Sequence, residues 1–336
     1  MLVLACFLLV PVITVQAGEK FSLRGFNFIQ TEQVKLNHLQ TILSLKRLKR
    51  TGADTVALVP FLWQARTGAR QIIKGNAVQD DELIAGIQSA HALGLKVIIK
   101  PHVWVTGAWA GEVAPERGAA WNEWFEHYRF IILQYARLAQ KEGVEYFIIG
   151  TELRHANLSK RSWSQLISSV RYVYKGHITY AAHGIEQANK FCCWQALDSI
   201  AATVYPVLSN NTEPVDMHKV EDVIRKTLNA LKRIGVEYNK PVWLAEVGQR
   251  SARDSLSRPW ESPEQRLAAV DLELQSQVNG MWAQAAAGLG IDGLLFWNWY
   301  SDPDAGGDDD TDFTVQNKPA ERRLTCLWAN RCVDII

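Results

Sequence analysis

The sequence lacks a surplus of charge of either sign. Its 36 Lys and Arg residues stand against 35 Asp and Glu residues, giving a formal net charge of +1. Proteins that bind nucleic acid or an anionic membrane surface usually carry a basic excess, so this balance argues against both partners. We therefore expect no nucleic-acid binding and no stable membrane insertion, and the balance suits an uncharged ligand.

Cysteine is also scarce, with five residues in the chain. No Cys-x-x-Cys or Cys/His spacing of a zinc site is present, and we expect neither a metal site nor a cofactor. Cys326 and Cys332 lie close enough in sequence for a local disulfide, whereas adjacent Cys192 and Cys193 would need a strained ring to pair with each other. Connectivity cannot be read from sequence, and the alternative that all four are reduced stays open.

Charged side chains are missing from residues 1–17, which read MLVLACFLLVPVITVQA. The apolar core ends in Val15-Gln16-Ala17, the small-residue pattern of a cleavage site. The segment is short and interrupted by proline, which disfavours a membrane-spanning helix. We interpret residues 1–17 as a signal peptide, which predicts a secreted or periplasmic protein. A retained N-terminal anchor and a buried segment are the alternatives.

Sequence signatures of several enzyme classes are missing as well. The chain has no HExxH zinc motif, no GxSxG nucleophile turn and no Ser/His/Asp pattern. Its acidic run, Asp308-Asp309-Asp310 with Asp312, lacks the ligand spacing of an EF-hand calcium loop. We therefore interpret this run as a solvated loop rather than a calcium site.

What the sequence does contain is an alternation of strand-like and helix-like segments. Eight apolar runs predict strands, and most are continuous, as expected for parallel strands covered on both faces. The strands begin near residues 21, 55, 96, 146, 177, 199, 241 and 293. Helical patterns lie at roughly 33–50, 80–93, 119–142, 162–174, 216–235 and 262–287, and the segment after the fifth strand predicts only a short helix.

Eight strands with intervening helices form either a closed barrel or a large doubly wound sheet. The sheet usually carries a glycine-rich nucleotide loop after its first strand, but here that turn reads FNFIQTEQ. No repeat, linker or change of composition divides the chain. We therefore predict an α/β fold with a single (β/α)8 TIM barrel spanning residues 18–336.

Two glutamates close apolar, strand-like runs: Glu152 in YFIIGTEL and Glu246 in PVWLAEVG. Counting strands places them at the ends of the fourth and seventh strands, on the face where such barrels carry their chemistry. Two facing carboxyls can hydrolyse a glycosidic bond, with retention when about 5–5.5 Å apart and with inversion when roughly 6.5–9.5 Å apart. For either glutamate alone, a structural ion pair with a neighbouring strand is the alternative.

The remaining strand ends carry polar and aromatic side chains, which suits a sugar site. Sugar hydroxyls need hydrogen-bond partners, and pyranose rings pack their C–H faces on flat aromatic surfaces. The alternatives are that His102 is a satisfied core histidine and that Trp297 or Trp299 packs against a helix. The expected substrate-binding residues are Trp63, Arg66, Lys100, His102, Trp104, Thr151, His183, Tyr205, Trp297 and Trp299.

With these residues identified, the chain resembles glycoside hydrolase family 113, whose characterised members include β-mannanases, in the clan of retaining (β/α)8 glycosidases. The resemblance implies Glu152 as acid/base, Glu246 as nucleophile and Tyr205 as support for the nucleophile. It also implies that His102 and Trp297 line the sugar subsite beside the scissile bond. The matching segments, between residues 95 and 321, are LKVIIKPHVW, FIIGTEL, WQALDSIAATVYPV, KPVWLAEVGQRS and FWNWYSDPDAGGDDDTDFTVQNKPAE.

One departure concerns the wider clan, which usually has Asn immediately before its acid/base where this chain has Thr151. We expect residues 18–336 to form the catalytic domain of a monomeric, retaining endo-β-1,4-mannanase that acts by double displacement on a polysaccharide or oligosaccharide. One alternative is a hydrolase of an exported bacterial polysaccharide or oligosaccharide. The other, of a different class, is a non-catalytic carbohydrate-binding barrel.

Overall fold

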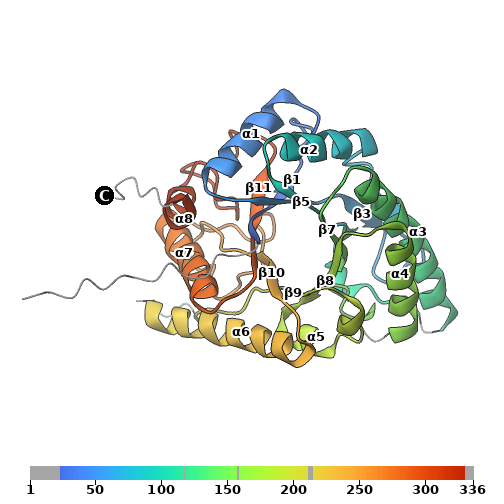
Figure 1. Ribbon diagram of the computed structural model, residues 1–336. Helices are drawn as coiled ribbons and strands as arrows, with labels where there is room; N and C mark the ends of the chain where they lie inside the picture. Colours follow the sequence, from blue (N-terminus) through green and yellow to red (C-terminus); the bar gives the residue numbers. More distant parts are fainter. Residues whose placement is uncertain (1–22, 117, 157–158, 211–214, 330–336) are drawn as a thin grey trace, which may run out of the picture.

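The computed structural model describes residues 23–116, 118–156, 159–210 and 215–329. The predicted signal peptide and Cys332 lie outside these ranges. Eight parallel strands close into a barrel that is ringed by helices, which confirms the predicted (β/α)8 architecture (Figure 1). In chain order the barrel strands are β1 (Leu23–Ile29), β2 (Thr55–Leu58), β5 (Lys96–Ile99), β7 (Tyr146–Thr151), β8 (His177–His183), β9 (Ile200–Thr203), β10 (Val242–Val247) and β11 (Gly293–Tyr300).

Prolines interrupt the second and third predicted strands, which the sequence had suggested were continuous. β3 (Phe61–Gln64) begins after Pro60, and β6 (His102–Val105) begins after Pro101. Proline has no N–H to donate and cannot continue a central ladder. β3 and β6 therefore leave the barrel beyond its carboxyl-terminal mouth and pair with each other, and β4 (Ile73–Lys74) pairs with β3 to complete a separate three-stranded sheet.

Helices cover the outside of the barrel and agree with the predicted segments except at two starts and at the last helix, residues 319–329, which was not predicted. The first helix begins at Leu39 rather than near residue 33, because His38 caps it. The helix expected from residue 262 begins only at Leu272, where the Asp271 carboxylate accepts a hydrogen bond from the Leu274 N–H at 3.0 Å. The helices are α1 (Leu39–Arg50), α2 (Asp80–Ala92), α3 (Ala119–Lys141), α4 (Lys160–Val173), α5 (Gly184–Lys190), α6 (Met217–Tyr238), α7 (Leu272–Gly288) and α8 (Pro319–Ala329).

The barrel interior is filled by an apolar layer with a polar layer above it. Because side chains alternate along a strand, residues two apart point into the same interior. The apolar layer includes Ile98, Ala181, Ala201 and Leu295. The polar layer is formed by the residues two positions after each of these, which are Lys100, His183, Thr203 and Trp297. This upper layer forms the floor of the barrel mouth, while a larger apolar core lies between the strands and the helices.

Trp299 corrects a sequence-based expectation, because its side chain lies in this outer core and not in the mouth. It is fully buried, packs against Phe26 at a ring distance of 4.9 Å and donates from Nε1 to Ser44 Oγ at 2.8 Å. The spacing of two suggested that Trp297 and Trp299 face the same side. However, β1 pairs Asn27 with Trp297 and the next residue with Trp299, so an extra residue bulges out of β11 and turns the two indoles apart.

The described cysteines and helices bear on two further expectations. Cys192 and Cys193 are free thiols whose sulfur atoms lie 2.7 Å apart, while Cys326 is disulfide-bonded. Its expected pairing with Cys332 stays a prediction, because Cys332 is outside the described residues. Within the described ranges, no helix is long and apolar enough to cross a membrane.

Trp299→Ala should lower the free energy of unfolding by about 3–5 kcal/mol, because it empties a large core volume. Trp104, which is 59% exposed, is the matched control of the same residue type. Its replacement by alanine should cost about 0.5 kcal/mol or less. Urea unfolding followed by circular dichroism measures both values, and equal losses for the two variants would contradict the placement of Trp299.

Candidate functional site

Glu246 lies near the end of β10, where a register shift against β9 turns its side chain toward the mouth. It is 7% exposed, so its carboxylate needs partners. The Lys100 ammonium lies 2.5 Å from Oε2, and the Tyr205 hydroxyl donates to Oε1 at 2.8 Å. Burial and the adjacent Glu246 raise the pKa of Tyr205, so its phenol stays protonated and remains a donor. One cation and one hydroxyl thus hold one oxygen each.

Lys100 is itself held in place by β1. Its side chain is fully buried, and Nζ donates to Asn27 Oδ1 at 2.8 Å. Asn27 in turn donates to the backbone carbonyls of Ala245 and Phe296 at 3.1 and 3.3 Å, which ties it to β10 and β11. The Trp297 ring lies 5.3 Å from the ammonium, a cation–π distance. Lys100 was expected to bind substrate, but it is buried beneath the mouth and positions Glu246 instead.

Glu152 follows directly after β7, at a sharp turn of the chain with φ of 58°. This left-handed conformation is uncommon for a residue with a side chain, and such conformations cluster at functional sites. Oε1 accepts hydrogen bonds from Thr203 Oγ1 at 2.5 Å and faces His183 Nδ1 at 2.9 Å. Oε2 accepts from Trp109 Nε1 at 2.6 Å. Side chains from three different segments therefore orient this carboxylate.

The surroundings of Glu152 favour its ionised form. Burial alone would raise its pKa, but the hydrogen bond and the positive charge of His183 outweigh burial. With His102 and Thr203 adding to this effect, the pKa of Glu152 is lowered to about 2. Glu152 is therefore ionised at neutral pH in the unliganded protein, and His183 Nδ1 lies within hydrogen-bond distance of it.

His102 is the first residue of β6 in the outer sheet, and it interacts electrostatically with both carboxylates. Burial lowers its pKa, although both Glu152 and Glu246 oppose that shift electrostatically. Its imidazole is therefore neutral at pH 7. Within the described ranges, the buried Nδ1 atom has no hydrogen-bond partner, which is unusual for a buried polar group. This geometry disfavours the core-histidine alternative and suits an atom that meets a ligand hydroxyl.

The loop after β11 supports the site from behind, and it is not simply the solvated loop that the sequence suggested. Phe313 packs edge-on against Tyr205 at 5.9 Å. The neighbouring Asp312 accepts from the Tyr300 hydroxyl at 2.6 Å, and Asp310 pairs with the buried Lys318 at 2.7 Å. Only the first two carboxylates of the acidic run are exposed. Within the described residues, no cluster of His, Cys, Asp and Glu is arranged to hold a metal ion.

The other predicted binding residues lie in three kinds of place: exposed on the surface beside the mouth, buried in the barrel, or around the two glutamates. Trp63 and Trp104 lie exposed on the three-stranded sheet beside the mouth. Arg66 is exposed in the turn after β3 and lines a shallow surface groove away from the carboxylates. Thr151 is 1% exposed, because the end of β7 packs it inside, so it is not placed to contact a substrate. His183, Tyr205, His102 and Trp297 surround the two glutamates as expected.

Sequence reasoning missed Trp109 and Thr203 as partners of Glu152. Thr203 had a usable signal, because it follows the inward-facing Ala201 by two residues at the end of β9. Trp109 had none. It lies in the irregular segment after β6, just before a short 3-10 turn at Ala110–Glu112, and only the folded path brings its indole to the carboxylate.

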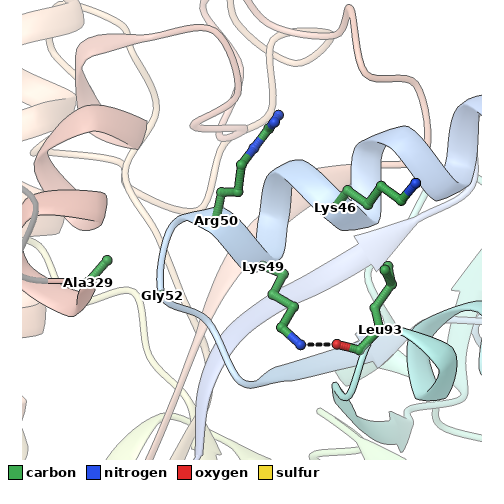
Figure 2. A pocket seen from close by; sticks show the side chains of 6 residues that line it. All are labelled: Lys46, Lys49, Arg50, Gly52, Leu93 and Ala329. Carbon is green, nitrogen blue, oxygen red and sulfur yellow. Dashed lines mark hydrogen bonds between the residues drawn. The ribbon is translucent and has the colours of Figure 1, made fainter.

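A second hollow, shown in Figure 2, lies at the opposite end of the barrel. It sits where α1 ends and the chain turns toward the start of β2, and Lys49 donates to the Leu93 carbonyl there. Cations at a helix carboxyl terminus complement the helix dipole, so this basic lining has a structural explanation. No carboxylate lines it, which sets it apart from the mouth. Its lining residues are Lys46, Lys49, Arg50, Gly52, Leu93 and Ala329.

The low pKa of Glu152 predicts an acid-dependent stability. Because the folded pKa lies below the unfolded value, Glu152 stabilises the fold above about pH 4.5, and this contribution is lost as the pH falls toward 2. The difference in unfolding free energy between the parent and Glu152→Gln should therefore shrink by about 3 kcal/mol between pH 6 and pH 2. In His183→Ala the loss should begin at higher pH. Parallel parent and Glu152→Gln curves would contradict this electrostatic picture.

Comparisons with known proteins agree with this geometry. The model of Glycoside Hydrolase Family 113 matches residues 26–318. The solved complex of a family 113 β-1,4-mannanase superposes with a TM-score of 0.81 at 26% identity, covering 93% of this chain and 100% of that chain. A family 113 β-mannanase from Alicyclobacillus acidocaldarius, in complex with ManMIm, gives 0.80 at 26% identity, with coverages of 92% and 97%.

A more distant structure shares the fold alone. The β-glucuronidase from Ruminococcus gnavus superposes with a TM-score of 0.61 at 14% identity, covering 91% of this chain and 50% of that chain. None of the curated proteins matches this sequence. The family model spans nearly all of the barrel and includes both carboxylates of the mouth. The chain therefore belongs to glycoside hydrolase family 113.

Proposed function

We propose that this glycoside hydrolase cleaves β-1,4-mannan by a retaining double displacement. The observation that supports the mechanism best is the contrast between the two carboxylates of the mouth. Glu246 is paired with the buried Lys100 side chain, whereas Glu152 is paired with the partly exposed imidazole of His183. The solved family members named as β-mannanases support the substrate.

In the first step, Glu246 attacks the anomeric carbon and the bond to the leaving oxygen breaks. Tyr205 and Lys100 hold one carboxylate oxygen each, so the nucleophile keeps a single orientation. The same two donors then stabilise the carboxylate when it leaves in the second step. His102 and Trp297 lie beside it, where they would contact the sugar whose bond is broken.

Glu152 supplies the proton to the leaving oxygen and later removes a proton from the attacking water. Because its carboxyl is ionised in the unliganded protein, the first proton has to reach it from a neighbour. His183 Nδ1 lies 2.9 Å from Oε1, and its ring is partly open to solvent, with 39% of the side chain exposed. We assign His183 as the neighbour that passes this proton to Glu152.

The setting of the enzyme is also part of the proposal. The apolar segment at residues 1–17 and its small-residue ending support export to the periplasm or the medium. An exported enzyme would meet a polymeric substrate outside the cytoplasm.

Glu246→Ala should lower kcat on the true substrate at least about a thousandfold, because it removes the carboxylate that attacks the anomeric carbon. Added azide should restore activity by entering the space that the carboxylate leaves. Glu221→Ala, on the outer helix α6, is the matched control and should keep parental kcat. Assays on mannan, glucan, xylan and galactan, with product anomers followed by NMR, test the substrate and the mechanism together.

Release of the β-anomer first from mannan is the expected result. Initial release of the α-anomer would mean inversion and would contradict the double displacement. Cleavage of another polysaccharide but not of mannan would overturn the substrate assignment while leaving the carboxylate roles intact. Unchanged kcat in Glu246→Ala would overturn the nucleophile assignment.

A further inference from the structure

The small sheet beside the mouth exposes a continuous row of apolar side chains. β3 pairs in register with β6 and β4, so that Trp63 stands opposite Trp104 on one side and Ile73 on the other. These three side chains are 42%, 59% and 46% exposed. Large apolar side chains are rarely exposed side by side without a function, and adjacent ones form a patch rather than scattered single residues.

The orientation of this row follows from the alternation of the strands. In β3 and β6, the residues between the exposed ones, such as Leu62, Gln64 and Val103, are buried against the body of the protein. Gln64 Oε1 accepts a hydrogen bond from Trp124 Nε1 of α3 at 2.8 Å, which anchors that buried face. The sheet therefore cannot turn its tryptophans inward without exposing its own core.

The row is continuous with the catalytic centre. Phe61 and His102 form the next cross-strand pair on the same face, two positions closer to the barrel along their strands. The Phe61 ring contacts His102 and Trp104 edge-on, at 5.8 Å in both cases. His102 lies in the field of both catalytic glutamates. One step of two residues spans roughly 7 Å along a strand, comparable to the length of one sugar unit.

We infer that the exposed face formed by Phe61, Trp63, Ile73 and Trp104 is an extended subsite that binds further units of an uncharged β-linked glycan beyond the scissile bond. This inference rests on the proposed function and adds a place and a direction for the chain. Both strands run outward from the mouth, so the rings form a path that leads away from the carboxylates.

Two features favour a glycan over other occupants of this face. None of the four side chains carries a charge, and Lys74 of β4 turns to the opposite side, where its ammonium lies over the Tyr135 ring at 4.7 Å. The Trp63 indole is also held in place, because Nε1 donates to Thr106 Oγ1 at 3.2 Å. A fixed, uncharged aromatic surface suits the apolar face of a pyranose ring, and it loses little side-chain entropy on binding.

The test measures binding separately from hydrolysis. In a Glu246→Gln background, which leaves the glycan uncut, Trp63→Ala/Trp104→Ala is compared with its parent by affinity electrophoresis in gels containing galactomannan, xyloglucan, xylan or galactan. We expect at least about tenfold weaker binding to the glycan that the parent retains. Phe130→Ala/Tyr172→Ala, which removes exposed aromatics from the outer helices α3 and α4, should bind as the parent does. Circular dichroism verifies that each variant is folded.

A second measurement uses the catalytically active protein. The ratio of kcat/KM on a hexasaccharide to that on a trisaccharide should fall in Trp63→Ala/Trp104→Ala, because only the longer chain reaches the outer rings. Trp104→Phe should recover part of this ratio, since a flat ring is restored. A uniform loss on both substrates would indicate general damage to the site and would overturn the extended subsite.

The outcomes separate this inference from the proposed function. If the active enzyme cleaves mannan but the tryptophan variant binds it as tightly as its parent, the subsite is overturned and the function stands. If the variant loses binding to a different glycan, the subsite is supported and the mannan assignment falls. If none of the four polysaccharides in the activity assay is cleaved and none of the four glycans in the gels is retained, both are overturned. Self-association that disappears in the variant, with unchanged glycan binding, would assign the face to a second copy and overturn the subsite.

Discussion

The buried ion pair between Lys100 and Glu246 is the interaction on which the site depends. Neither group could stay charged there alone, because desolvating an unpaired ammonium or carboxylate costs several kcal/mol. The pair joins β5 to β10 across the barrel, and Asn27 completes the bridge to β1. A closed barrel is required for this geometry, since the three strands are far apart in sequence and only closure directs their ends to one mouth. The fold and the proposed nucleophile are thus stabilised by the same contact.

Around this pair, the protein treats its two carboxylates differently. Glu246 is held by the buried Lys100 side chain and by a phenol that stays protonated. Glu152 is held by the Thr203 hydroxyl, the Trp109 indole and the partly exposed His183 imidazole. An enzyme that uses one carboxylate for bond formation and the other for proton transfer needs this asymmetry. The small sheet adds a further element, because the prolines that end β2 and β5 also release the two strands that carry the exposed tryptophans.

The sequence predicted the barrel, the strand positions of Glu152 and Glu246 and most of their neighbours, because period-two patterning and strand counting determine which side chains reach the mouth. It failed where local geometry departs from that pattern. Pro60 and Pro101 divided two apparently continuous runs, and a bulge in β11 turned Trp299 into the core. Trp109 reaches Glu152 through an irregular segment whose path no periodicity encodes. Burial of Thr151 and Lys100 likewise depends on packing by other elements, which composition does not reveal.

The central claim is that Glu246 forms a covalent bond to the sugar while Glu152 handles the protons. The test uses a 2-deoxy-2-fluoro mannoside with a good leaving group. The fluorine slows both displacement steps, but the good leaving group keeps the first step fast, so the covalent glycosyl-enzyme accumulates. Peptide mapping by mass spectrometry should then find one added fluorosugar on the peptide containing Glu246 and none on the peptide containing Glu152. Labelling of Glu152, or turnover of the reagent without any covalent adduct, would contradict the account.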